Sequence, residues 1–149
     1  MAEASKTLQP GFNHADYNFI GGTEGNDDFT GQTTVGPDVI CGFGEDDVSA
    51  HNINDIFLGG AGYDFALFNW GTFNGGDGTD QVSNLNERSA TFNGGEGDDF
   101  VQDNDGTVNG GAGNDVVSHN SGTFDGGDGN DTVSFNFGGI LISVEQGDV

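Results

Sequence analysis

One nine-residue pattern recurs through most of this chain and restricts the folds open to it more than any other feature. Its clearest form is GGDGNDTVS, which begins at Gly126. Further copies read GGAGNDVVS from Gly110, GGEGDDFVQ from Gly94, GGDGTDQVS from Gly75 and GGAGYDFAL from Gly59. Weaker copies, CGFGEDDVS from Cys41 and GTEGNDDFT from Gly22, bring the number to seven. A unit repeated at this period predicts a stack of similar coils.

Each place in the repeat has a physical role. Glycine occupies the first, second and fourth places, and glycine accepts positive φ angles and close backbone approach. Aspartate at the sixth place supplies an oxygen ligand, and an apolar residue at or near the eighth place can point into a core. The repeat therefore predicts a tight loop, a ligand and a strand, in that order.

The spacing of the repeats indicates how each coil closes. The sixth-place aspartates are 16 to 19 residues apart, so one copy corresponds to one whole coil. A second motif, Asn-x-Gly followed by a short strand, lies between copies at residues 69–74, 104–109 and 120–125. Asn and Gly tolerate left-handed angles, which favours a tight turn. We therefore expect the Gly-Asp loops along one edge and the Asn-x-Gly turns along the other, where the insertion NLNERSA at residues 84–90 should bulge.

Strand alternation sorts the apolar residues into two inward-facing sets. One sheet is expected to contribute Val39, Phe57, Phe73, Phe92, Val108, Phe124 and Ile140. The other is expected to contribute Val48, Ala66, Val82, Val101, Val117 and Val133. The two sets predict a thin core between two sheets.

The pattern G-G-x-G-x-D-x-U-x resembles the calcium-binding repeat of RTX (repeats-in-toxin) proteins. The resemblance covers roughly residues 20–142. It implies an all-β fold, a right-handed parallel β-roll or β-solenoid of about seven coils with one row of Ca²⁺-binding loops. It also implies an ion between successive loops, and seven loops give at most six such sites.

The resemblance also implies the ligands. The carboxylates would come from the sixth-place aspartates Asp27, Asp46, Asp64, Asp80, Asp99, Asp115 and Asp131. Backbone carbonyls would come from the loop glycines and their neighbours, among them Gly59, Gly75, Gly94, Gly110 and Gly126. The first two loops depart from the pattern, because Thr23 and Cys41 stand at glycine places.

The charge of the chain favours cations as partners. The chain contains 25 acidic residues and only two basic ones, Lys6 and Arg88, which gives a formal net charge of -23. Carboxylates stacked about 4.8 Å apart repel by about 3.5 kcal/mol at an effective dielectric of about 20. Calcium binds about six to eight oxygen ligands in loose geometry, so we expect folding to be coupled to calcium. The same charge excludes nucleic acid and anionic membrane surfaces as natural partners.

Three segments are expected in the chain: residues 1–21 as an N-terminal arm and cap, 22–137 as the β-roll, and 138–149 as a closing strand and tail. The sequence contains no apolar run of 18 residues, so no membrane span is predicted. The N-terminus lacks the apolar region of a cleavable secretory signal. Cys41 is the only cysteine. We expect it to be a small filler, with an intermolecular bridge as the alternative.

No pattern in the sequence predicts catalysis. His14, His51 and His119 are scattered and do not recur at a spacing with Ser, Cys or another His. The zinc motif H-E-x-x-H is missing, and the serines at 83, 118 and 134 share one outward strand position. We therefore expect a protein that is not an enzyme.

Three functions remain open. The first is a secreted, calcium-stabilised structural protein of the extracellular space or cell surface, exported by type I secretion and assembling as a homo-oligomer or end to end into fibres or a surface layer. The second is ice binding, through a ladder of Thr72/Asn74, Thr91/Asn93, Thr107/Asn109 and Thr123/Asp125. The third is a folding and export module of a larger secreted protein.

Overall fold

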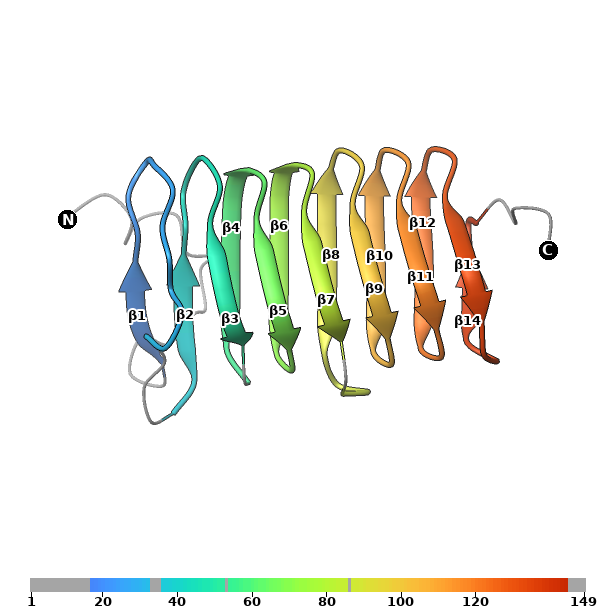
Figure 1. The fold of residues 1–149 in the computed structure, drawn as a ribbon, viewed down its shortest axis with the longest axis horizontal. Helices are drawn as coiled ribbons and strands as arrows, with labels where there is room; N and C mark the ends of the chain where they lie inside the picture. Colours follow the sequence, from blue (N-terminus) through green and yellow to red (C-terminus); the bar gives the residue numbers. More distant parts are fainter. Residues whose placement is uncertain (1–16, 33–35, 53, 86, 145–149) are drawn as a thin grey trace.

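The chain folds as a parallel β-solenoid of about seven turns (Figure 1). The computed structural model describes residues 17–32, 36–52, 54–85 and 87–144. Six turns contribute one strand to each of two sheets, and at the two ends β1 and β14 add a strand to the larger sheet alone. Every pairing among the described strands is parallel. The expectation of an all-β solenoid is confirmed.

The larger sheet contains eight strands in the order β1-β2-β4-β6-β8-β10-β12-β14. Their bounds are β1 Asn18–Gly21, β2 Asp38–Cys41, β4 Ile56–Gly62, β6 Thr72–Gly78, β8 Thr91–Glu96, β10 Thr107–Ala112, β12 Thr123–Asp128 and β14 Ile140–Ile142. The strand β1 lies within the segment predicted to be an arm and cap, of which residues 1–16 lie outside the described residues.

The second sheet contains six strands in the order β13-β11-β9-β7-β5-β3. Their bounds are β3 Val48–Asn52, β5 Phe65–Asn69, β7 Gln81–Leu85, β9 Phe100–Asn104, β11 Val116–Asn120 and β13 Thr132–Asn136. The two sheets meet at the Gly-Asp loops along the upper edge in Figure 1 and at the Asn-x-Gly turns along the lower edge. Among the described residues, no helix is long and apolar enough to cross a membrane.

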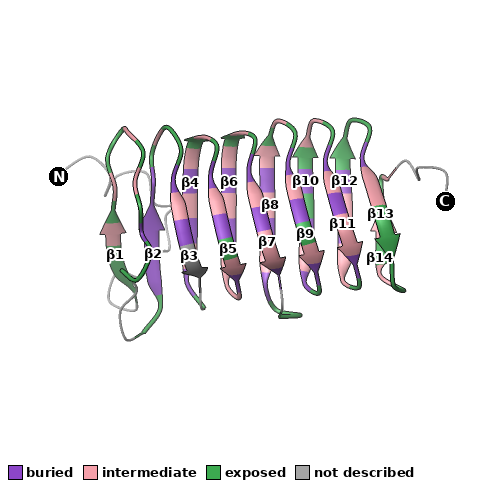
Figure 2. Ribbon diagram, in the orientation of Figure 1, coloured by how far each residue is buried: buried purple, intermediate pink, exposed green. Residues whose placement is uncertain are grey.

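Apolar side chains from both sheets fill the space between them. The rings of Phe57 and Phe73 stack with centroids 4.7 Å apart, and those of Phe73 and Phe92 lie 5.1 Å apart. Opposite these rings, the second sheet contributes smaller residues: Ala66, Val82, Val101 and Val117 are all buried. Figure 2 shows this buried strip running through the middle coils, while the last coil is largely exposed.

Three of the predicted core positions are wrong by one residue. Ile40, not Val39, pairs with Phe57 and belongs to the core cluster, although Val39 is also buried. Leu141, not Ile140, pairs with Phe124 and packs on the core, and Ile140 is 60% exposed. Ser49, not Val48, pairs with Ala66 and is buried. A shift of one residue moves a side chain to the opposite face of a strand, and all three errors occur in coils whose sequence departs from the repeat.

The Asn-x-Gly edge is built around a ladder of buried asparagines. Asn69, Asn104 and Asn120 are all 1% exposed or less. The side chain of Asn104 donates to Oδ1 of Asn120 at 2.7 Å and to the carbonyl of Thr123 at 3.0 Å. Its own Oδ1 accepts the N–H of Gly106 at 2.9 Å, which closes the turn. The ladder therefore ties each turn to the next coil.

The glycines of these turns are needed for a different reason from the one predicted. Gly71, Gly106 and Gly122 are not among the residues with positive φ. Instead, each lies so close to the preceding coil that a Cβ would overlap its backbone, at Asp55, Ala90 and Gly106 respectively. The predicted bulge of the insertion is present at this edge, between β7 and β8 (Figure 1).

Candidate metal centre

The Gly-Asp loops owe their shape to two positive φ angles. In the fourth loop, between β6 and β7, these are Gly76 and Gly78, with φ of 125° and 135°, the second and fourth places of the repeat. The same pair of angles occurs in the other regular loops, at Gly60 and Gly62, Gly95 and Gly97, Gly111 and Gly113, and Gly127 and Gly129. Residues with a Cβ rarely adopt this conformation, so the repeat specifies the loop.

The first-place glycine lies against the sixth-place aspartate of its own loop. A Cβ on Gly94 would overlap Oδ2 of Asp99 and would come within 2.6 Å of the carbonyl oxygen of Gly110 in the next coil. Gly59, Gly75, Gly110 and Gly126 have the same relation to Asp64, Asp80, Asp115 and Asp131. The glycine thus leaves space in which a carboxylate oxygen and, beside Gly75, Gly94, Gly110 and Gly126, a backbone carbonyl oxygen lie close together.

One aspartate from each loop contributes to a continuous ladder, which we call the aspartate column. It consists of Asp27, Asp47, Asp64, Asp80, Asp99, Asp115 and Asp131. In every successive pair, the backbone N–H of one aspartate donates to Oδ1 of the next, over 2.7 to 2.9 Å. All members except Asp27 are buried.

The prediction of Asp46 as a member of this column is wrong. Asp47 occupies the place, and Asp46 is exposed. In this loop the positive φ angles fall on Phe43 (88°) and Glu45 (61°), so the repeat begins at Gly42 rather than at Cys41. The segment CGFGEDD fits the repeat in two alignments one residue apart. One begins at Cys41 and puts Asp46 at the sixth place, and the other begins at Gly42 and puts Asp47 there. The sequence alone favoured the first, which is wrong.

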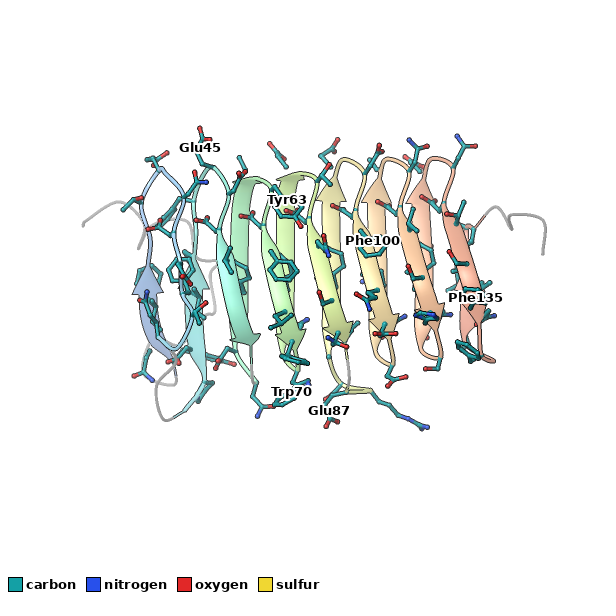
Figure 3. The ribbon with its side chains drawn as sticks, viewed as in Figure 1. Glu45, Tyr63, Trp70, Glu87, Phe100 and Phe135 are labelled. Carbon is teal, nitrogen blue, oxygen red and sulfur yellow. The ribbon has the colours of Figure 1, made fainter. Side chains whose placement is uncertain are left out.

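Asp46 belongs instead to a second row of loop residues that the sequence analysis missed. Its Oδ1 accepts the N–H of Tyr63 in the next coil at 2.9 Å. Asp98 accepts the N–H of Asn114 at 2.7 Å, and Asn114 accepts the N–H of Asn130 at 3.1 Å. These exposed fifth-place residues link the tips of the loops, where Glu45 and Tyr63 are labelled in Figure 3.

In most members of the column, the second carboxylate oxygen has no hydrogen-bond partner. Oδ2 is buried and unpartnered at Asp47, Asp64, Asp80, Asp99 and Asp115. At Asp27, in the first loop, Oδ2 instead accepts the N–H and the hydroxyl of Thr23, at 2.6 and 3.0 Å. Leaving such an oxygen buried without a partner is costly, so these five atoms are the main unexplained polar groups of the described residues.

Burial makes four carboxyls of the column, those of Asp64, Asp80, Asp99 and Asp115, hard to ionise. It raises the pKa of Asp64 to about 7 and that of Asp99 to about 8, against hydrogen bonds from Asp47 and Asp80 that lower them. The pKa values of Asp80 and Asp115 rise to about 6 for the same main reason. Neighbouring carboxylates add to the shift at Asp64, Asp99 and Asp115. The column would therefore gain from a bound cation or from protons.

The ligand atoms present are carboxylate and carbonyl oxygens, which hard cations prefer. Within the described residues, no three His, Cys, Asp or Glu side chains form a group that could hold a metal. Each coil offers one Oδ2, and most also place a carbonyl oxygen of the next loop close to it. A cation would therefore have to draw ligands from two loops and from the backbone, which suits Ca²⁺.

The remaining candidate residues do not join this centre. Cys41 is buried, and burial raises the pKa of its thiol to about 11, which favours the filler role over a reactive thiol. Nδ1 of His119 lies 3.0 Å from Oδ1 of Asp103, at the opposite edge of the solenoid. His14 lies outside the described residues.

The fold and the centre define a parallel β-solenoid with a ladder of buried aspartates along one edge, an arrangement compatible with a β-roll. No family model, no curated protein and no solved structure matches the chain.

Proposed function

We propose that this protein binds calcium along the aspartate column and folds as a calcium-dependent structural solenoid of the RTX type. The observation that carries the proposal is the row of five buried Oδ2 atoms without hydrogen-bond partners, at Asp47, Asp64, Asp80, Asp99 and Asp115. A divalent cation between successive loops would give these atoms a partner and offset the repulsion along the column. Asp47, Asp64, Asp80, Asp99, Asp115 and Asp131 would supply carboxylate oxygens, and Gly59, Gly94, Gly110 and Gly126 carbonyl oxygens.

Calcium titration of the metal-free chain tests this proposal. As calcium rises, far-UV circular dichroism should become more β-rich and the melting temperature should rise, and calorimetry should count up to about six ions. If each site bound calcium at ten times its Kd, the ions would add about 1.4 kcal/mol each. A chain with identical spectra and melting temperatures in chelator and in millimolar calcium would refute the proposal.

The structural role follows from the ends of the solenoid. Among the described strands, β14 pairs only with β12 and β13 only with β11, so each leaves one edge unpaired. Phe135, Ile140 and Ile142 on this last coil are exposed. Unpaired edges of this kind can template another chain, which supports end-to-end assembly once calcium has reduced the charge. Sedimentation that stays monomeric as protein and calcium rise together would exclude it.

Ice binding is the second candidate, because the predicted Thr-x-Asn ladder is in register on the outer face of the larger sheet. Thr72, Thr91, Thr107 and Thr123 pair across four adjacent strands, as do Asn74, Asn93, Asn109 and Asp125. Asn93 donates to Asn74 at 2.6 Å and Asn109 donates to Asn93 at 2.7 Å, which fixes the amides in a regular row. Thermal hysteresis measured with calcium present, and lost in Thr91→Lys, would support this candidate.

Export by type I secretion is part of the same proposal. A chain whose fold is much less stable without calcium would stay largely unfolded in a low-calcium cytosol and fold after release, either alone or as a module of a larger secreted protein. Secretion of the chain by a cell that carries a type I export system, compared with a cell that lacks one, tests this step.

A further inference from the structure

A hollow of about 380 Å³ lies on the surface at the Asn-x-Gly edge, across the solenoid from the aspartate column. It is lined by Asp103, Asn104, Asp105, His119, Ser121 and Phe137. None of these residues belongs to the repeat loops, and neither the calcium proposal nor the ice-binding candidate uses them.

Three successive coils form the hollow, and each brings a different chemistry. Strand pairing places Asp103, His119 and Phe135 side by side on β9, β11 and β13. Two residues further along each coil stand Asp105, Ser121 and Phe137. The surface therefore passes from two carboxylates, through an imidazole and a hydroxyl, to two aromatic rings within three coils.

The carboxylates have little compensation for their charge. Oδ1 of Asp105 accepts the hydroxyl of Ser121, and Oδ1 of Asp103 lies 3.0 Å from Nδ1 of His119, without the geometry of a hydrogen bond. Within the described part of the chain, no lysine or arginine forms an ion pair with either aspartate. Each carboxylate thus keeps its second oxygen for a donor from outside.

Phe137 lines the aromatic side of the hollow, and Phe135 stacks on the same imidazole beside it. The Phe135 and Phe137 rings stack on His119, with centroids 5.5 and 6.0 Å away and interplanar angles of 16° and 25°. Yet Phe135 is 57% exposed and Phe137 69% exposed. Apolar rings held this far out of the core are suited to contact with a ligand.

We propose that this hollow binds a guanidinium group, presented by a small molecule or by an arginine side chain. A guanidinium is planar, donates to carboxylates through its fixed fork of N–H groups and stacks on aromatic rings. Both halves of the hollow therefore match one group. A hydrated metal ion would use the carboxylates but not the rings, and a neutral ligand would leave the charge of the carboxylates unmatched.

Amide NMR titration of the full chain in calcium-containing buffer tests the proposal, with N-butylguanidinium as the probe and uncharged N-butylurea as its comparator. We expect saturable shifts confined to residues 103–105, 119–121 and 135–137 with the guanidinium alone. Asp103→Asn should weaken binding about tenfold, because a charge-assisted hydrogen bond is lost. Phe137→Ala, at an exposed position that the fold does not need, should weaken it about threefold.

Asp77→Asn is the matched control, because it removes the same charge from an exposed loop residue at the opposite edge. It should leave the affinity for the guanidinium unchanged. Equal binding of butylurea, equal weakening by Asp77→Asn, or shifts spread over all the acidic loops would overturn the proposal. Displacement of the probe by Zn²⁺ at equimolar concentration would replace it with a metal site. Since the calcium proposal concerns the other edge, either can fail without the other.

Discussion

Asp46 and Asp47 are adjacent and carry the same charge, yet only one of them is in the aspartate column. Asp47→Asn keeps an oxygen for the N–H of Asp27 and places an uncharged amide at the buried Oδ2. Without calcium this variant should be more stable than the parent, by about 1 kcal/mol, because burial of the carboxylate is avoided. With saturating calcium the order should reverse, because an amide is a poorer ligand than a carboxylate.

Thermal melts of both variants, with and without calcium, check this reversal. Asp46→Asn is the control and should follow the parent in both conditions to within about 0.5 kcal/mol, because its side chain is on the surface. If the two substitutions behave alike, or if Asp46→Asn alone loses the calcium response, the alignment that begins at Gly42 is wrong.

The first-place glycines allow a second test at the residue scale. Gly94→Ala introduces a Cβ that overlaps Oδ2 of Asp99 and crowds the carbonyl of Gly110. We expect the free energy of unfolding to fall by about 2 kcal/mol or more, in the range of overpacked cores. Gly25→Ala is the control, because its nearest neighbour would be the Thr23 hydroxyl at 3.8 Å. Denaturant titration gives both values, and a tolerated Gly94→Ala would contradict the close approach.

The sequence was sufficient to identify which residue types form the column, but not every member of it. Five of the seven aspartates stand in unambiguous repeats, and Asp27 was assigned correctly from a weak one. At Asp46 and Asp47 the pattern fits two alignments, and the backbone decides between them only through the φ angles of Phe43 and Glu45. Which carboxylate oxygen lacks a partner depends on contacts between coils, and these are not encoded in a single repeat.

At the scale of single elements, the asparagine ladder should stabilise the turns independently of any metal. Asn104→Ala removes the bonds to Gly106, Asn120 and the Thr123 carbonyl and leaves buried groups unpaired. The expected cost is about 2 to 3 kcal/mol, of the order of the desolvation penalty for such groups. Urea denaturation with and without calcium should give the same loss.

The exposed Asn109 provides the comparison for this ladder. Its side chain also donates to an asparagine of the adjacent strand, Asn93, at 2.7 Å, but on the solvent face. Asn109→Ala should therefore cost less than about 0.5 kcal/mol, because water replaces the lost bond. Equal effects of the two substitutions would show that burial of the ladder does not contribute to stability.

The elements of the fold were predictable because both periods, the coil and the strand alternation, are written in the sequence. The two edges and the site of the insertion were placed correctly. The reason why residues 71, 106 and 122 must be glycine was not predictable. A Cβ at these positions would overlap the backbone of the preceding coil, whereas their φ angles are not positive. The same holds for β14, where Gly138 and Gly139 shift the register and turn Ile140 outward.

At the scale of the whole molecule, the aspartate column makes stability depend on pH in an unusual direction. In the unfolded chain, aspartates lose their protons near pH 3.9. In the folded, metal-free chain, Asp80 and Asp115 hold theirs to about pH 6, Asp64 to about 7 and Asp99 to about 8. Between these limits the folded state binds more protons than the unfolded state, so stability falls as pH rises.

From these groups, metal-free protein should therefore melt at its highest temperature at or below about pH 4 and lose stability progressively up to about pH 8, beyond which the column contributes no further change. Calcium requires the ionised carboxylates, so its stabilising effect should be small at pH 5 and large at pH 8. The melting temperatures in chelator and in millimolar calcium, measured by calorimetry, should therefore differ more and more as pH rises. A metal-free melting temperature that rises from pH 5 to pH 8 would mean that the buried aspartates are already ionised and paired without metal, which removes the physical basis for the calcium sites.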